Sequence, residues 1–138
     1  MDSVFFIAIG GALGALGRFW TGIAVSALFR GRFPLGTFMV NVAGSFLIGL
    51  TASAIASGRL GDAPWNALVM QGLCGALTTF STFSMDSFRL FHEGGRTMAV
   101  ANVALSLILC LGPPRPVWLF LLLSSLRFLP PFIRREQI

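Results

Sequence analysis

The sequence predicts an all-α membrane protein with four transmembrane helices. Of its 138 residues, 55% are hydrophobic and only 11% are charged, and the apolar residues lie in long runs. A water-soluble domain is about 25% charged. A spanning helix takes about 20 apolar residues, so a chain of this length has room for four spans at most once short loops are subtracted. The composition therefore excludes an ordinary soluble fold.

Four apolar runs divide the chain, and we expect spans at about 4–29, 35–56, 65–91 and 97–112. The first run lacks the basic segment and the cleavage site of a signal peptide, so we expect it to be retained as a span. Pro34 suits the start of the second run, because its missing N–H would have no helical partner there. Residues 1–112 are thus predicted to form one membrane domain.

The charge pattern argues against nucleic acid as a partner. The net charge of +5 rests on ten Arg that are scattered singly or in pairs, whereas a nucleic-acid surface needs its basic residues clustered on one face. The loops on the two sides of a four-span topology carry four and three of these Arg, so the positive-inside rule sets almost no orientation. Such a chain is able to insert both ways, and two copies are then able to pair upside down.

Residues 113–138 form a divergent tail that holds five of the seven Pro, four of the ten Arg and none of the sixteen Gly. Pro113, Pro114 and Pro116 would stop or kink a fourth helix that is still too short to cross the hydrocarbon core. Two interpretations stay open: the Pro-rich apolar tail completes a kinked fourth helix, or it arises from a shifted reading frame.

Polar and small residues inside the first two runs are candidates for packing or for function. Gly10 and Gly14 have the spacing that lets another helix approach closely in lipid. Arg18 either snorkels to the interface or lines a vestibule that concentrates anions. Asn41 shares a stripe with Thr37, and its amide either bonds a neighbouring helix or presents its N–H donors to an anion.

The third run contains the stretch Gly75-Ala76-Leu77-Thr78-Thr79-Phe80-Ser81-Thr82-Phe83-Ser84. Its hydroxyls and glycine predict a break in the helix, and a break at membrane depth survives only when buried in protein or facing a water-filled cavity. The freed carbonyls, those of Gly75 and Thr78, would suit a hard monovalent cation, and the freed N–H groups and hydroxyls would suit an anion.

Phe80 and Phe83 share a helix face, as core residues often do, but the positive edges of their rings are also able to solvate a small anion. Ser106 in the fourth run either bonds backward to its own helix or lines the same path. One His and two Cys assemble no catalytic group, so we expect no enzyme activity.

These motifs, from Gly10-Gly11 to Arg18, from Gly36-Thr37 to Gly44-Ser45, and above all Gly75 to Ser84, make residues 4–112 resemble the CrcB/Fluc family of fluoride channels. The resemblance implies a passive, fluoride-specific channel that spans the bacterial inner membrane several times and lets toxic fluoride leave the cytoplasm. It implies an antiparallel dual-topology homodimer with two pores in the lipid bilayer.

Residue-by-residue matching implies a fluoride path along Asn41, Phe80, Phe83, Ser106, Thr37 and Thr82. It also implies a vestibule role for Arg18 and a structural sodium ion, Na+, held by the backbone carbonyls of Gly75 and Thr78 at the dimer centre. Asp86 stands where the family often has Glu, and the tail after Gly112 departs from the Gly- and Ala-rich ending of the family.

Two other functions compete with this one. A proton-coupled small multidrug exporter needs a carboxylate inside the membrane, and the acids of this chain lie at ends or in loops, with Asp86 as the nearest to an exception. A structural subunit would explain the glycines of the first run but would leave the hydroxyls of the third run idle.

Overall fold

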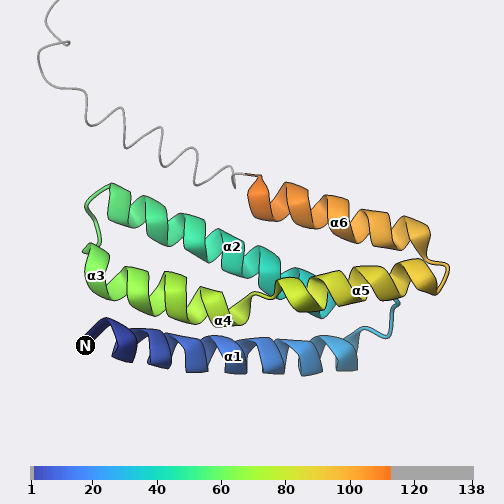
Figure 1. Cartoon of the computed structure of the whole chain (residues 1–138), viewed down its shortest axis with the longest axis horizontal. Coiled ribbons are helices and arrows are strands. Elements are labelled where there is room, and N and C mark those ends of the chain that lie inside the picture. The colour runs from blue at the N-terminus through green and yellow to red at the C-terminus, as the bar shows by residue number, and fades with distance from the viewer. Residues whose placement is uncertain (1, 113–138) are drawn as a thin grey trace, which may run out of the picture.

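The computed structural model describes residues 2–112, which form an all-helical bundle of four rods (Figure 1). The tail at 113–138, with the two interpretations given above, lies outside the described residues. The first, second and fourth rods are α1 (Asp2–Leu28), α2 (Leu35–Ala56) and α6 (Arg96–Leu111). The third rod is composite and consists of α3 (Asp62–Trp65), the π-helix η1 (Asn66–Cys74), α4 (Gly75–Leu77) and α5 (Phe80–His92).

The third rod is the centre of the bundle. Figure 1 shows α1 running along one side of α3, η1 and α4, whereas α2 lies on the other side and α6 lies beside α5. The two halves of the third rod therefore have different neighbours: η1 and α4 pack chiefly on α1, and α5 packs chiefly on α6. The junction between the halves is reached by α2 and α6.

Close packing of α1 on η1 depends on glycine. A Cβ added at Gly10 would collide with the carbonyl oxygen of Leu68, and one added at Gly14 would collide with that of Leu73. Both neighbours are backbone atoms, which have little room to yield. The spacing of these glycines predicted such an approach, and the structure confirms it with η1 as the partner.

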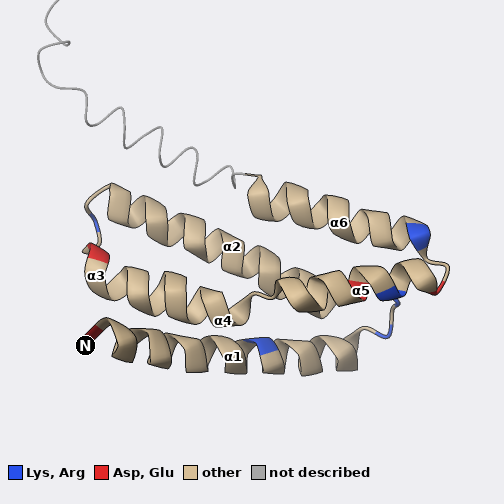
Figure 2. Cartoon of the chain, in the orientation of Figure 1, with Lys and Arg blue, Asp and Glu red and all other residues tan. Residues whose placement is uncertain are grey.

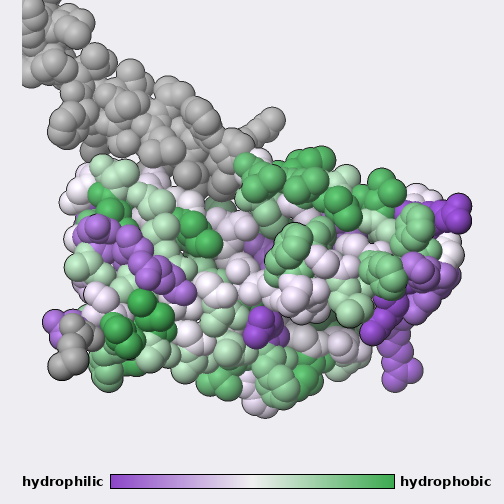
Figure 3. All heavy atoms as spheres, in the orientation of Figure 1, coloured by the Kyte–Doolittle hydropathy of each residue, from purple (hydrophilic) through white to green (hydrophobic). Residues whose placement is uncertain are grey.

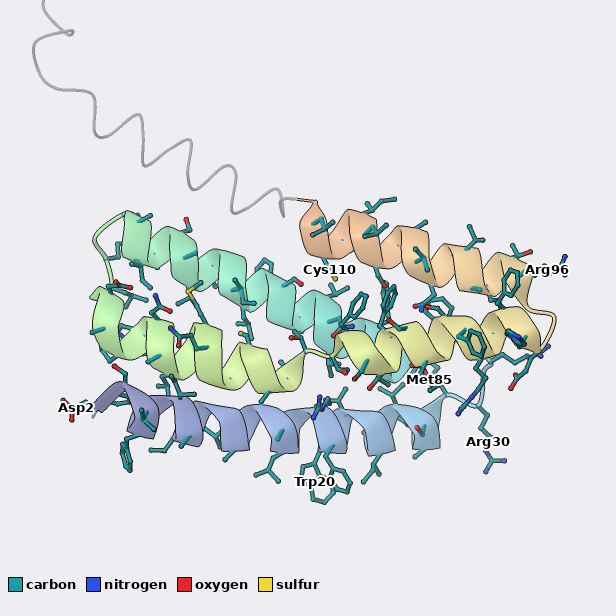
Figure 4. All side chains as sticks on the ribbon, in the orientation of Figure 1. Asp2, Trp20, Arg30, Met85, Arg96 and Cys110 are labelled. Carbon is teal, nitrogen blue, oxygen red and sulfur yellow. The ribbon has the colours of Figure 1, made fainter. Side chains whose placement is uncertain are left out.

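The apolar helices present most of their surface outward. α1 and α2 are long and apolar enough to cross a membrane, and α6 is apolar but shorter. Only 11% of the most apolar window of α1 is buried, and 22% of that of α2. The core helix of a soluble protein would bury such a window. Large side chains such as Trp20, which points away from the bundle in Figure 4, make this a surface for lipid, and hydrophobic patches are visible on the face in Figure 3.

Charged side chains of the described residues gather toward the two ends of the bundle, with one basic band part-way along α1 (Figure 2). At one end, Arg32 donates a hydrogen bond to the carbonyl oxygen of Glu93 at 3.0 Å, and it lies 3.7 Å from the carboxylate of the same residue. This contact ties the α1–α2 loop to the α5–α6 loop. Both side chains are more than half exposed, so the ion pair adds little stability.

Candidate functional site: a cavity at the break in the third rod

Helical geometry stops at Leu77 and resumes at Phe80. Thr78 (φ −79°, ψ 157°) and Thr79 (φ −152°, ψ 118°) are both extended. Thr79 is the N-cap of α5, and its hydroxyl accepts a hydrogen bond from the N–H of Thr82 at 3.3 Å. The N–H of an N-cap residue has no helical partner, and its carbonyl is able to accept a second hydrogen bond, so both groups of Thr79 are open to partners elsewhere.

Asn41 of α2 supplies those partners. Its side-chain oxygen accepts from the N–H of Thr79 at 2.7 Å, and its side-chain nitrogen donates to the carbonyl of Thr79 at 3.0 Å. Of the two sequence interpretations, the amide therefore does bond a neighbouring helix. An amide nitrogen has two N–H donors, and the second makes no hydrogen bond to the described residues. That donor leaves the anion interpretation open.

The break frees the carbonyl oxygens of the last helical turn, among them the two predicted to hold a cation, those of Gly75 and Thr78. In a continuous helix, Gly75 would accept from the N–H of Thr79, and Thr78 from that of Thr82. Here the first of those donors bonds Asn41 and the second bonds the Thr79 hydroxyl. The two carbonyls lie at the negative end of α4. Oxygen atoms of this kind suit a hard cation, and no group of three or more His, Cys, Asp or Glu among the described residues offers a side-chain site instead.

A cavity of about 340 Å³ lies against the break. Four of the six residues of the predicted path line it, namely Asn41, Phe80, Phe83 and Ser106. The rings of Phe80 and Phe83 are 5.8 Å apart between centroids and are tilted by 42°. The rest of the described lining is Ser45, Ile48, Thr78, Thr79, Leu107, Cys110 and Leu111, so no charged side chain of residues 2–112 faces the cavity.

Ser106 is buried, with 7% of its surface exposed, and its hydroxyl has no hydrogen-bond partner among the described residues. The backward bond to α6 that the sequence allowed is therefore not made. A buried polar group without a partner costs about 1 to 3 kcal/mol. Such an orphan at a cavity wall indicates a water or a ligand that completes it.

The family described as "CrcB-like protein, Camphor Resistance (CrcB)" matches residues 5–113. The chain belongs to the CrcB family. Three relatives named "Fluoride-specific ion channel FluC" are similar to it. That of Shewanella amazonensis is 48% identical over 80% of this chain and 89% of its own length. That of Vibrio cholerae is 45% identical, over 75% and 82%.

The third relative, from Methylococcus capsulatus, is 45% identical over 79% of this chain, and the match spans 48% of that relative's own length. The family inferred from the motifs is thus confirmed. The relatives of this CrcB-family chain are named as channels and not as enzymes, in agreement with the expectation that the chain has no enzyme activity.

The remaining predicted path residues of this CrcB-family chain, Thr37 and Thr82, line a second cavity of about 440 Å³ near the α1–α2 loop. The Thr37 hydroxyl donates to the carboxylate of Asp86 at 2.8 Å, which joins α2 to α5. Arg30, Arg32 and Arg89 contribute to the same wall, together with Glu93. The structure therefore divides the predicted path between two cavities.

Arg18 lines neither cavity; it is exposed on α1. Within a single chain, Arg18 shares no cavity with the other residues of the predicted path. The basic residues that do border a cavity lie in the α1–α2 loop and in the last turn of α5; their positions in the sequence indicated only topology.

Sequence reasoning missed Asn102 and Ser87 altogether. Asn102 of α6 is 1% exposed, and its amide nitrogen donates to the Ser87 hydroxyl at 2.9 Å. Ser87 in turn donates to the carbonyl of Phe83 at 2.8 Å. This chain of bonds ties α6 to the backbone of a cavity residue. The available signal was an amide in an apolar run, four residues before Ser106.

Proposed function

We propose that this protein is a passive, fluoride-selective channel of the bacterial inner membrane that lets cytoplasmic fluoride leave the cell. One observation carries the proposal: the second N–H of the Asn41 amide and the unpartnered hydroxyl of Ser106 border one cavity with Phe80 and Phe83, and no charged described residue lines it. The names of the relatives support fluoride as the ion.

The chemistry of the cavity suits a small halide. Fluoride is strongly hydrated, so it leaves water only where several donors replace that water in quick succession. An amide N–H, a serine hydroxyl and the positive edges of two phenyl rings are such donors. A carboxylate in the wall would repel the anion, and its absence from the described lining keeps the path open. Larger halides would be excluded by the narrowness of the path.

Thr37 and Thr82 would serve the same ion at the loop end of the bundle. Their cavity carries three Arg, which attract anions, and Asp86 and Glu93, which offset part of that charge. A fluoride ion would meet this cavity between the aqueous phase and the path beside the break. Arg18 would act in a vestibule only where a second copy brings it near the path.

An antiparallel dual-topology homodimer with two pores is the assembly that fits this chain. Phe80 is 80% exposed, and among residues 2–112 the cavity beside it is walled only by α2, the break, α5 and α6. A second copy would supply the remaining wall. The near-equal Arg counts on the two sides permit both orientations, and four spans through the bilayer would put the break at mid-membrane depth.

Structural sodium fits the same assembly. The carbonyl oxygens of Gly75 and Thr78 would hold Na+, because both have lost their helical donors and Gly75 is exposed on the single chain. When bound, the ion supplies positive charge that neutralises the carbonyl ends of two facing helices. Two copies would together offer twice the ligands of one.

The decisive experiment is fluoride efflux from liposomes that contain the purified protein, followed with a fluoride electrode. We expect rapid fluoride release and no chloride release from matched liposomes loaded with potassium chloride. Empty liposomes give the background. Equal chloride release, or sealed vesicles in the presence of well-folded protein, would overturn the proposal.

A further inference from the structure

The cavity beside the break also contains a thiol, that of Cys110. Asn102, Ser106 and Cys110 follow one another at intervals of four residues, so they form a row along one face of α6. Exposure rises along that row: Asn102 is 1% exposed, Ser106 is 7% exposed, and Cys110 is only partly buried. Cys110 thus lies at the more open end of the row, one residue before α6 ends at Leu111.

Cys110 and the orphan hydroxyl of Ser106 line the same cavity. In Figure 4 the side chain of Cys110 points from α6 toward the start of α5. The thiol is free, and no disulfide occupies it. Ser106 independently marks this cavity as a place where a ligand is able to bind, because the residue is only 7% exposed and its hydroxyl has no partner among the described residues.

We propose that Cys110 is a binding site for a soft, thiol-seeking metal species such as mercury(II), and that its occupancy closes the ion path. Thiolate sulfur is the soft ligand among protein side chains. Neutral mercury(II) chloride enters an apolar cavity more readily than a hydrated cation, which would have to shed its water. As the S–Hg bond forms, the thiol releases its proton and the metal releases one chloride ion, leaving a sulfur-bound mercury chloride.

The adduct would stand beside Ser106 in a cavity of about 340 Å³ that Asn41, Phe80 and Phe83 share. It would fill the space through which a small anion passes these donors. The other cysteine offers a matched control: Cys74 is 0% exposed, lies at the end of η1 and does not line the cavity. The two cysteines are the only ones in the sequence.

The predicted loss of fluoride efflux rests on the proposed channel function, whereas the predicted binding of mercury to Cys110 does not. The test therefore has two readouts on the full-length protein in liposomes: the mass of the intact protein after treatment with mercury(II) chloride, and fluoride efflux before and after treatment. For the unsubstituted protein we expect one mercury adduct and a fall in efflux of at least tenfold, reversed by dithiothreitol. Cys74→Ala should respond in the same way.

Cys110→Ala should take up no mercury, and its treated and untreated efflux rates should be equal. No adduct on the unsubstituted protein would overturn the binding site, whether or not the protein conducts fluoride. An adduct on Cys110 with unchanged efflux would overturn the closing of the path. If mercury inhibited Cys110→Ala as strongly as the unsubstituted protein, the inhibition would come from another group, and this result would also overturn the proposal.

Discussion

The amide of Asn41 and the backbone of Thr79 bond each other twice, across 38 positions of sequence. The pair works in both directions, because the amide oxygen accepts at 2.7 Å and the amide nitrogen donates at 3.0 Å. It pairs the N–H of Thr79 that α5 leaves without a partner, and it adds a bond to the carbonyl of the same residue. Asn41 therefore holds the break open while one N–H of its amide stays available to the cavity.

Asn41→Asp tests this double role. The carboxylate is still able to accept from the Thr79 N–H, but it no longer donates, and it brings negative charge into an uncharged wall. Loss of a donor costs about 1 to 3 kcal/mol, and 1.4 kcal/mol corresponds to a factor of about ten. We expect fluoride efflux to fall at least about tenfold. Gln71→Glu adds the same charge at an exposed position of η1 outside both cavities and should retain the efflux; equal losses in the two variants would contradict the assignment.

Two buried serines allow a matched test of the path. The hydroxyls of Ser106 and Ser53 both lack partners among the described residues, but only Ser106 lines the cavity beside the break. Ser→Ala replaces the unsatisfied hydroxyl by hydrogen and removes a cost of about 1 to 3 kcal/mol, so neither change should lower the unfolding temperature. Ser106→Ala should slow fluoride efflux severalfold, and Ser53→Ala should leave it unchanged. Unimpaired efflux in Ser106→Ala would remove Ser106 from the path.

Alanine substitutions at two neighbouring glycines of α1 should change the stability of the fold in different directions. A Cβ at Gly10 collides with backbone of η1, whereas one at Gly11 meets nothing within 4 Å in the same chain. Overpacking costs about 1 to 3 kcal/mol, and Gly→Ala in an open helix position gains up to about 1 kcal/mol. Thermal unfolding in detergent should show a lowered midpoint for Gly10→Ala and an unchanged or raised one for Gly11→Ala. The reverse order would mean that α1 does not pack on η1 as described.

The bond between Asn102 and Ser87 should be visible in a double-mutant cycle. Ser87→Ala leaves the fully buried amide of Asn102 without its acceptor, at a cost of about 1 to 3 kcal/mol in unfolding free energy. Combining it with Asn102→Ala removes both polar groups, so the double variant should lose less than the sum of the single changes. Strict additivity, measured by chemical unfolding, would show that the two side chains do not interact.

Removal of sodium tests the proposed ion at the dimer centre. Replacing Na+ by an equal concentration of N-methylglucamine, which is too large for a site made of backbone carbonyls, keeps the ionic strength constant. A ligand at 100 times its Kd stabilises the form that binds it by about 2.7 kcal/mol. Light scattering in detergent should then report a weaker dimer, restored by added sodium. An identical dissociation profile in the two buffers would exclude a structural role for the ion.

Much of the architecture follows from the order of residues. Long apolar runs predict membrane helices, because hydropathy and helix length are properties of a continuous segment. The spacing of Gly10 and Gly14 predicted a close helix contact without naming its partner. The stretch from Gly75 to Ser84 contributed most to the resemblance to the family, together with the motifs of the first two runs, since hydroxyls in such density are unusual in a span.

Other features have no local signature. The π-helical turns of Asn66–Cys74 are such a feature, and so is the separation of Thr37 and Thr82 from the other path residues, which depends on how far α2 and α5 extend past the break. The bond from Asn102 to Ser87 likewise joins two helices whose faces must first meet.

Residue order was therefore sufficient for the all-helical class and the family, because each of these is read from one segment at a time; the four spans stay a prediction, which α1 and α2 support by their length and hydropathy. It left open whether Asn41 bonds a helix and whether Ser106 bonds its own helix. Packing of α2, α5 and α6 settled both points: it brought Asn41 to Thr79 and left the Ser106 hydroxyl without a partner at the cavity wall. Hydrogen bonds reach only about 3 Å, so partners far apart in the chain are chosen by the position of whole helices.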